Sequence, residues 1–166
     1  MPTLSYRNAS PSDLERIVEI YNSTVSSRMS TADTEPVTIE SRRKWFEDHN
    51  PKNRPLWIIE SEERQIIGWL SFQSFYGRPA YEATAEISLY IDAAYRGKGM
   101  GNEIMQYCLA KVPELGIKTL LAYVFSHNLP SIKLLLRHGF QEWGTLPDIA
   151  VLDGQERSVT ILGRRI

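Results

Sequence analysis

The segment from residue 90 to residue 101 constrains the fold most, because it joins a strand to a helix through a glycine-rich turn. Residues 84–92 alternate between apolar and polar side chains, which predicts a strand with one buried face. Glycines then follow at alternate positions, Gly97, Gly99 and Gly101, and helical spacing of apolar residues begins at about residue 99. Backbone N–H groups at such a helix start lack internal partners. With Arg96 and Lys98 beside them, they predict a binding site for an anion such as a pyrophosphate.

Two common nucleotide-binding motifs do not fit this turn. A dinucleotide-binding fingerprint that uses Gly97 and Gly99 needs a third glycine at the position of Asn102. A Walker A loop needs glycine where the chain has Asp92, and serine or threonine where it has Gly99. The alternative interpretation is a glycine-rich connection with two solvated cations.

The rest of the chain predicts alternating groups of helices and strands. Strands are expected over 4–6, 56–60, 66–76, 84–92, 119–125, 140–143 and 157–162, and helices over about 11–25, 38–50, 99–112 and 130–137. The order β-α-α-β-β-β-α-β-α-β-β predicts an α/β (α+β) fold, a mixed sheet with helices on its faces.

Composition excludes several classes of protein. The 166 residues fit one domain, and a net charge of −1 gives no field that would attract nucleic acid or an anionic membrane. Cys108 is the only cysteine, so no internal disulfide is expected, and the three histidines lack the spacing of metal ligands. No signal peptide and no run of 18 apolar residues is present. These features predict a cytoplasmic protein without metal or membrane association.

Two motifs resemble those of a known superfamily. The turn at residues 96–101 reads Arg-Gly-x-Gly-x-Gly and resembles the acetyl-CoA pyrophosphate loop of the GCN5-related N-acetyltransferases (GNAT). Asn128 and Ser131, followed by Gly139-Phe140, resemble the second cofactor motif of this superfamily. The resemblance implies a mixed, mostly antiparallel twisted sheet of about seven strands flanked by about four helices. It also implies that residues 1–166 form a single N-acetyltransferase domain.

Four further stretches resemble the phosphinothricin and methionine sulfoximine N-acetyltransferases within that superfamily, namely residues 20–22, 35–38, 78–81 and 86–90. This resemblance implies transfer of an acetyl group from acetyl-CoA by direct attack of the α-amine of a small amino acid analogue. It also implies a homodimer, in which residues 149–152 and the C-terminal strands can form the interface.

Glu86 is the expected general base. It lies on the polar side of the strand that leads into the glycine turn, and an amine must lose a proton before it attacks a thioester. The resemblance also implies the residues that bind the cofactor, which are Leu89, Tyr90, Ile91, Arg96, Gly97, Lys98, Gly99, Met100, Gly101, Asn128 and Ser131. The substrate residues that it implies are Arg78, Tyr81, Met29 and Glu35.

Three points stay open at this stage. The acceptor can be another amine, such as another amino acid, a polyamine or a protein N-terminus, or the domain can sense acetyl-CoA without turnover. The general acid for the thiolate is also open, because Leu135 stands where the family has tyrosine or histidine. The candidates for this role are Tyr123, Ser126, His127 and water. The physiological acceptor depends on the shape of a pocket that the sequence does not define.

Overall fold

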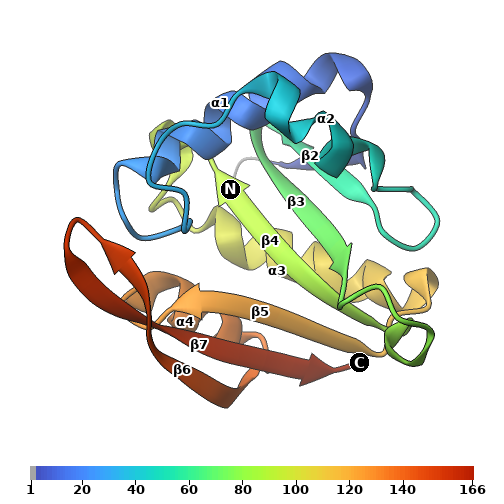
Figure 1. Cartoon of the computed structure of the whole chain (residues 1–166). Helices are drawn as coiled ribbons and strands as arrows, with labels where there is room; N and C mark the ends of the chain where they lie inside the picture. Colours follow the sequence, from blue (N-terminus) through green and yellow to red (C-terminus); the bar gives the residue numbers. More distant parts are fainter. Residues whose placement is uncertain (1–2) are drawn as a thin grey trace.

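The computed structural model describes residues 3–166, which form a seven-stranded sheet with helices on both faces (Figure 1). The strands are β1 (Ser5–Asn8), β2 (Leu56–Glu60), β3 (Ile66–Ser74), β4 (Thr84–Ile91), β5 (Thr119–Phe125), β6 (Gln141–Leu152) and β7 (Gln155–Arg165). Their spatial order is β1-β2-β3-β4-β5-β7-β6, and every neighbouring pair is antiparallel except β4 and β5. The expected mixed, mostly antiparallel sheet is therefore confirmed.

In this described range, four α-helices cover the sheet, α1 (Leu14–Val25), α2 (Ile39–Glu47), α3 (Met100–Lys111) and α4 (Leu129–Arg137). Short 3-10 helices occupy Pro11–Asp13, Pro79–Tyr81, Ala93–Tyr95 and Val112–Leu115. Within residues 3–166, none of the helices is long and apolar enough to cross a membrane.

Apolar side chains divide into two layers, one on each face of the sheet. The layer under α1 and α2 includes Ile17 and Ile20, which pack against Trp69 of β3. The layer under α3 and α4 includes Met105 and Leu135, together with the inward residues of β4 and β5. Because successive residues of a strand point to opposite faces, each strand between the helix pairs supplies side chains to both layers.

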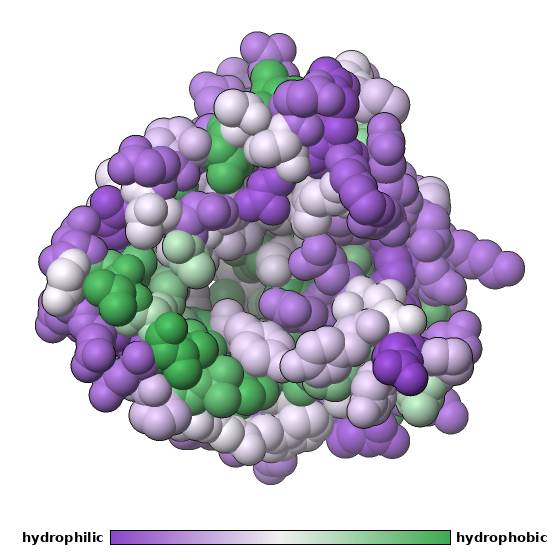
Figure 2. Space-filling model, viewed as in Figure 1, coloured by the Kyte–Doolittle hydropathy of each residue, from purple (hydrophilic) through white to green (hydrophobic). Residues whose placement is uncertain are grey.

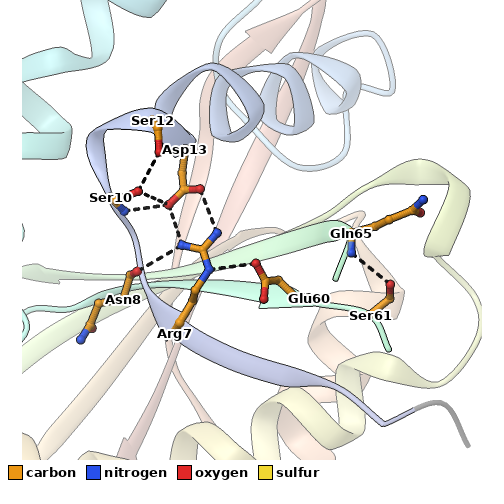
Figure 3. A network of polar contacts seen from close by, with 8 residues as sticks. All are labelled: Arg7, Asn8, Ser10, Ser12, Asp13, Glu60, Ser61 and Gln65. Carbon is orange, nitrogen blue, oxygen red and sulfur yellow. Dashed lines mark hydrogen bonds and ion pairs between the residues drawn. The ribbon is translucent and has the colours of Figure 1, made fainter. Parts of the chain in front are cut away.

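Arg7 fixes the start of α1 against the sheet (Figure 3). Its guanidinium donates hydrogen bonds to both oxygens of Asp13, at 2.7 and 2.9 Å, and to Glu60 Oε1 on β2 at 2.8 Å. The backbone N–H of Ser10 donates to Asp13 Oδ2 at 2.7 Å. The hydrogen bonds from Arg7, which have the largest effect, and those from Ser10 hold the pKa of Asp13 below its ordinary value. The network therefore positions α1, which carries part of the site described below.

The C-terminal hairpin differs from the sequence-based expectation. A short strand was expected over 140–143, with 149–152 as a separate stretch, but β6 runs without interruption through both. Pro147 lies between these two stretches, and a proline lacks the N–H group that a sheet ladder uses. The register with β7 shifts between Leu146 and Ala150, and Asp148 has a φ of 49°. This irregularity accommodates the proline on an edge strand.

Candidate functional site

Strands β4 and β5 pair only at one end and then diverge. Their parallel register covers Thr84 to Glu86 against Thr119 to Leu121. Beyond this point β4 stays paired with β3 as far as Ile91, and β5 stays paired with β7 as far as Phe125. The sheet therefore opens into a wedge between β4 and β5, which is visible in Figure 1.

The wedge exposes main-chain groups of β4. The N–H of Asp92 donates to the carbonyl of Ile67 at 2.8 Å. The even-numbered residues of β4 therefore direct their main-chain hydrogen-bonding groups toward β3. Hydrogen-bonding direction alternates along an antiparallel strand. The odd-numbered residues Ile87, Leu89 and Ile91 therefore direct their N–H and C=O groups into the wedge, where β5 no longer pairs with β4. This edge inside the sheet can pair with an extended amide-containing ligand.

A cavity of about 120 Å³ occupies the wedge. Its lining comes from β4, β5, the start of α4 and the loop after α1, and consists of Met29, Ser30, Ile87, Ser88, Leu89, Tyr90, Met105, Ala122, Tyr123, Val124, Phe125, Asn128, Ser131, Leu134 and Leu135. Figure 2 shows this face of the molecule hollowed near its centre. The cavity therefore lies where the strands separate and not on a smooth outer surface.

Residues 28–30 span the wide end of the wedge, and we call this segment the strap. Its carbonyl groups accept hydrogen bonds from His127 Nε2 at 2.8 Å, Asn128 Nδ2 at 3.0 Å and the Tyr90 hydroxyl at 3.1 Å. Tyr90 belongs to β4, whereas His127 and Asn128 follow β5. The strap therefore connects the two diverging strands, and it brings Met29 to the cavity.

Glu86 occupies the last paired position before the strands separate. Its side chain is half-buried and makes no hydrogen bond or ion pair within residues 3–166. Burial raises the pKa of its carboxyl group above the ordinary glutamate value. Tyr123 is close enough that Glu86 contributes to raising the pKa of its phenol, after burial as the larger cause. A free carboxylate with raised basicity thus lies at the narrow end of the wedge.

The glycine turn has the backbone conformation that its sequence predicts. Gly97 and Gly99 have φ values of 73° and 79°, a region that favours glycine, and Gly99 is the N-cap of α3. The N–H groups of Gly97, Lys98 and Gly99 make no hydrogen bond in the described part of the chain. A Cβ atom built on Gly97 would meet nothing within 4 Å. The turn therefore has free donors and open space in front of them.

Gly101 and Arg96 have packing roles within this turn. A Cβ atom on Gly101 would lie 3.0 Å from Leu134 Cδ2, so glycine permits the close approach of α3 and α4. Arg96 Nε donates to the carbonyl of Ile91 at 2.9 Å, which folds the guanidinium over the end of β4. Both contacts define the shape of the predicted anion site.

A depression of about 420 Å³ lies between the start of α3 and α4. The sequence-based predictions did not include its two basic residues, Lys133 and Arg137. Its lining is Gly99, Gly101, Asn102, Leu129, Pro130, Lys133, Leu134 and Arg137. Lys133 and Arg137 are four residues apart on α4 and so share one helical face. This i, i+4 spacing of two cations is the sequence pattern that could have predicted a basic helix face. The two cations extend the positive charge of the turn, and Arg137 also donates to Asn102 Oδ1 at 3.1 Å.

The predicted substrate residues do not all meet in one place. Met29 lines the wedge cavity, whereas Arg78 and Tyr81 line a separate depression of about 350 Å³ beside the start of β4. Glu35 is exposed in the loop between α1 and α2. The structure therefore brings Arg78 and Tyr81 together, but with Asp48 and other polar residues of that depression and not with Met29.

The structure reduces the candidates for the general acid. Leu135 is 7% exposed and packs in the core, where it has no proton to offer. Ser126 Oγ is within hydrogen-bond distance of Thr160 Oγ1 at 2.8 Å, and His127 Nε2 donates to the strap. Tyr123 lines the cavity beside Glu86, so among the three side chains it has the most suitable position.

Cys108 is fully buried, and burial raises the pKa of its thiol to about 12, which disfavours the thiolate. It packs in the apolar layer under α3, as expected. Across residues 3–166, histidine, cysteine and acidic side chains form no group of three that would hold a metal ion.

The family described as acetyltransferase (GNAT) domain matches residues 3–141. The chain belongs to the GNAT acetyltransferase family. YwnH of Bacillus subtilis (strain 168), which has a provisional assignment as a phosphinothricin acetyltransferase, is 52% identical over 98% of this chain and 99% of its own length. L-methionine sulfoximine/L-methionine sulfone acetyltransferase of Pseudomonas aeruginosa is 27% identical over 95% and 92%.

Solved structures support the same membership. The crystal structure of a protein provisionally assigned as a phosphinothricin N-acetyltransferase has 53% sequence identity and a TM-score of 0.95, with 98% of each chain covered. YncA from Salmonella typhimurium, solved with acetyl-CoA, has 25% identity and a TM-score of 0.89, covering 98% of this chain and 94% of its own. The resemblance to GNAT enzymes of the phosphinothricin and methionine sulfoximine type is thus confirmed.

Proposed function

We propose that this GNAT acetyltransferase transfers the acetyl group of acetyl-CoA to the α-amine of a small amino acid analogue, such as phosphinothricin or methionine sulfoximine. The observation that carries the proposal is the wedge between β4 and β5, with the unpartnered carboxylate of Glu86 at its narrow end. The names of the relatives support this class of acceptor, because they include phosphinothricin and methionine sulfoximine acetyltransferases.

The residues along the wedge fit acetyl-CoA. Its pantetheine arm carries amides that match the main-chain groups of Leu89 and the N–H of Ile91, whose carbonyl already accepts from Arg96. Its pyrophosphate matches the free N–H groups of the glycine turn. We assign cofactor binding to Leu89, Tyr90, Ile91, Arg96, Gly97, Lys98, Gly99, Met100, Gly101, Asn128 and Ser131. Tyr90 and Asn128 contribute through the strap, because their side chains hold its carbonyl groups.

When bound, acetyl-CoA supplies a thioester that an amine can attack. Glu86 takes the proton from the incoming ammonium group, and its raised pKa brings it closer to that of the amine, which favours transfer. A main-chain N–H at Leu89 or Ile91 donates to the developing oxyanion. Tyr123 donates a hydrogen bond to the departing sulfur, whose thiol has an ordinary pKa near 8.5 and needs little further help.

The proposed substrate residues belong to two separate parts of the structure, the wedge and the depression beside β4. Met29 forms an apolar wall of the wedge, and Glu35 lies in the same loop farther along the chain. We place Arg78 and Tyr81 at the distal end of the acceptor, where an arginine can bind a phosphinate or a similar polar group. A cytoplasmic location stays a prediction from the sequence.

We also propose that the enzyme is a homodimer through the β6–β7 hairpin. Ile149 and Val151 on the edge strand β6 are each 59% exposed, and apolar side chains are visible over this hairpin in Figure 2. Exposed apolar side chains on an edge strand favour association. Sedimentation velocity is expected to show a dimer for the wild type and a monomer for Val151→Asp. A monomeric wild type would contradict the proposal.

Release of free thiol from acetyl-CoA tests the function, with L-phosphinothricin, L-methionine sulfoximine and L-methionine as separate acceptors. We expect fast release with the first two, and slower release with methionine. A polyamine and a peptide with a free N-terminus are the comparison substrates. Preference for either of these would replace the proposed acceptor, and binding of acetyl-CoA without turnover of any amine would indicate a sensing domain.

A further inference from the structure

A second hollow lies beside the wedge, between the sheet and helices α1 and α2. It has a volume of about 120 Å³ and is lined by Tyr21, Arg42, Trp45, Trp69, Ser71, Gln73, Ser88 and Tyr90. Ser88 and Tyr90 also line the wedge cavity, so the two hollows adjoin along β4. Its lining thus combines small hydroxyl side chains with aromatic rings.

The floor of this hollow continues to the proposed general base. The register of β3 and β4 places Ser71 opposite Ser88 and Gln73 opposite Glu86. All four side chains share one face of the sheet, because alternate residues of a strand point the same way. Within residues 3–166, the side chains of Gln73, Glu86 and Ser88 make no hydrogen bond or ion pair, although all three are half-buried. A row of free polar groups therefore leads from Glu86 into the hollow.

Arg42 extends from α2 over the same hollow. Its guanidinium carbon lies 4.4 Å from the centre of the Tyr21 ring and 5.5 Å from that of Trp45. The arginine side chain is 24% exposed, and it makes a single hydrogen bond, to Asp33 Oδ2 at 3.3 Å. A guanidinium group has five N–H donors, so most of them have no acceptor in the described structure. Partial burial of a charge with so few partners is unfavourable unless a ligand supplies them.

We propose that Arg42 binds the α-carboxylate of the acceptor amino acid while its amine lies at Glu86. This inference rests on the proposed function and adds a specificity residue to it. Neighbouring positions on one face of a strand are about 6.7 Å apart. Ser88 is the next such position after Glu86 and lines the hollow together with Arg42, so an amine at Glu86 has its carboxylate beside the hollow. Gln73 and Ser88 can donate further hydrogen bonds between these two ends.

This arrangement selects α-amino acids over simple amines. A planar guanidinium binds a carboxylate through two parallel hydrogen bonds, and a carboxamide cannot replace the anion. An acceptor without the carboxylate leaves Arg42 with Asp33 as its single described partner. Most of its donors beside the aromatic rings then lack an acceptor, which is the situation that gives strong discrimination. Arg78, in its separate depression, stays available for the distal group of the acceptor.

The test measures the affinity of L-methionine sulfone and of its carboxamide for the protein saturated with coenzyme A, by isothermal titration calorimetry. The wild type is expected to prefer the acid. Arg42→Gln is expected to weaken binding of the acid by roughly 10- to 100-fold, the range for a lost charge-assisted hydrogen bond, and to leave the amide unchanged. In steady-state kinetics, KM for the acid rises while KM for acetyl-CoA stays the same.

Arg43→Gln is the matched control, because Arg43 is the next residue of α2 but is exposed and paired with Glu40 at 2.5 Å. It is expected to keep the wild-type preference. If Arg42→Gln does not fold, Asp33→Asn removes the negative charge of the internal partner of Arg42 and is expected to tighten binding of the acid alone. Equal weakening of acid and amide in Arg42→Gln would show a structural role and overturn the inference. Wild-type protein that acetylates no α-amino acid would overturn the proposed function itself.

Discussion

Substitution of Glu86 by glutamine is expected to lower kcat by about 10²- to 10³-fold at neutral pH, in the range of a lost general base. The affinity for coenzyme A is expected to stay at the wild-type value, because the glycine turn and the free edge of β4 are unchanged. Glutamine has nearly the same shape as glutamate but cannot accept the proton of the ammonium group. Stopped-flow kinetics and equilibrium binding of coenzyme A measure the two quantities separately.

The pH dependence follows from the raised pKa of Glu86. The base must be ionised, so kcat/KM falls as the pH decreases through a pKa above the ordinary glutamate value. Stability has the opposite dependence, because a carboxyl group with a raised pKa loses its contribution as the pH rises through that value. Glu86→Gln is therefore expected to be at least as thermally stable as the wild type at neutral pH. A less stable variant, with activity reduced in proportion, would indicate a structural role.

Glu47→Gln provides the matched control for this substitution. Glu47 is exposed at the end of α2 and has no ion pair within residues 3–166. It is expected to show wild-type kcat, pH profile and melting temperature. Retention of wild-type turnover by Glu86→Gln across the neutral and alkaline range would remove Glu86 from the mechanism.

Gly97→Ala is expected to weaken binding of acetyl-CoA by about 10-fold or more, through loss of charge-assisted hydrogen bonds to the pyrophosphate. A Cβ atom at this position meets no protein atom within 4 Å, so the space that it fills is the space in front of the turn. The left-handed backbone adds a strain of about 1–2 kcal/mol, which lowers the melting temperature by about 2–8 °C. Calorimetric titration with acetyl-CoA measures the affinity.

Gly116→Ala separates strain from ligand binding. Gly116 has a φ of 72°, against 73° for Gly97, and its added Cβ atom also meets nothing within 4 Å. It ends the 3-10 helix Val112–Leu115, far from the glycine turn in the sequence. We expect a similar loss of stability in the two variants, with loss of acetyl-CoA affinity only in Gly97→Ala. If Gly97→Ala and Gly116→Ala bound acetyl-CoA with equal affinity, the pyrophosphate would bind outside the glycine turn.

Local sequence patterns were sufficient for most of the fold. The alternation over residues 84–92 and the glycines after it predicted β4, the turn and α3 to within a residue or two. The full length of β6 was less predictable, because the effect of Pro147 depends on its neighbours. On an edge strand with a register shift, the missing N–H of proline has no consequence, and this context cannot be read from the residue itself.

The site was less predictable because it depends on divergence between strands. Glu86 could be recognised from its place on a polar strand face, but the length over which β4 and β5 pair is a tertiary property. In the sequence, Arg42 is one of three consecutive basic residues, Arg42 to Lys44, of a polar helix. Only the packing of α2 against Tyr21 shows that it faces the hollow while Arg43 points to solvent.

A crystal structure with coenzyme A and L-methionine sulfoximine bound would locate both substrates relative to Glu86. We expect the pyrophosphate at the N–H groups of the glycine turn and the pantetheine arm between β4 and β5. We also expect the sulfur and the acceptor amine near Glu86. Coenzyme A bound outside the wedge, or an acceptor amine remote from Glu86, would contradict the proposed function.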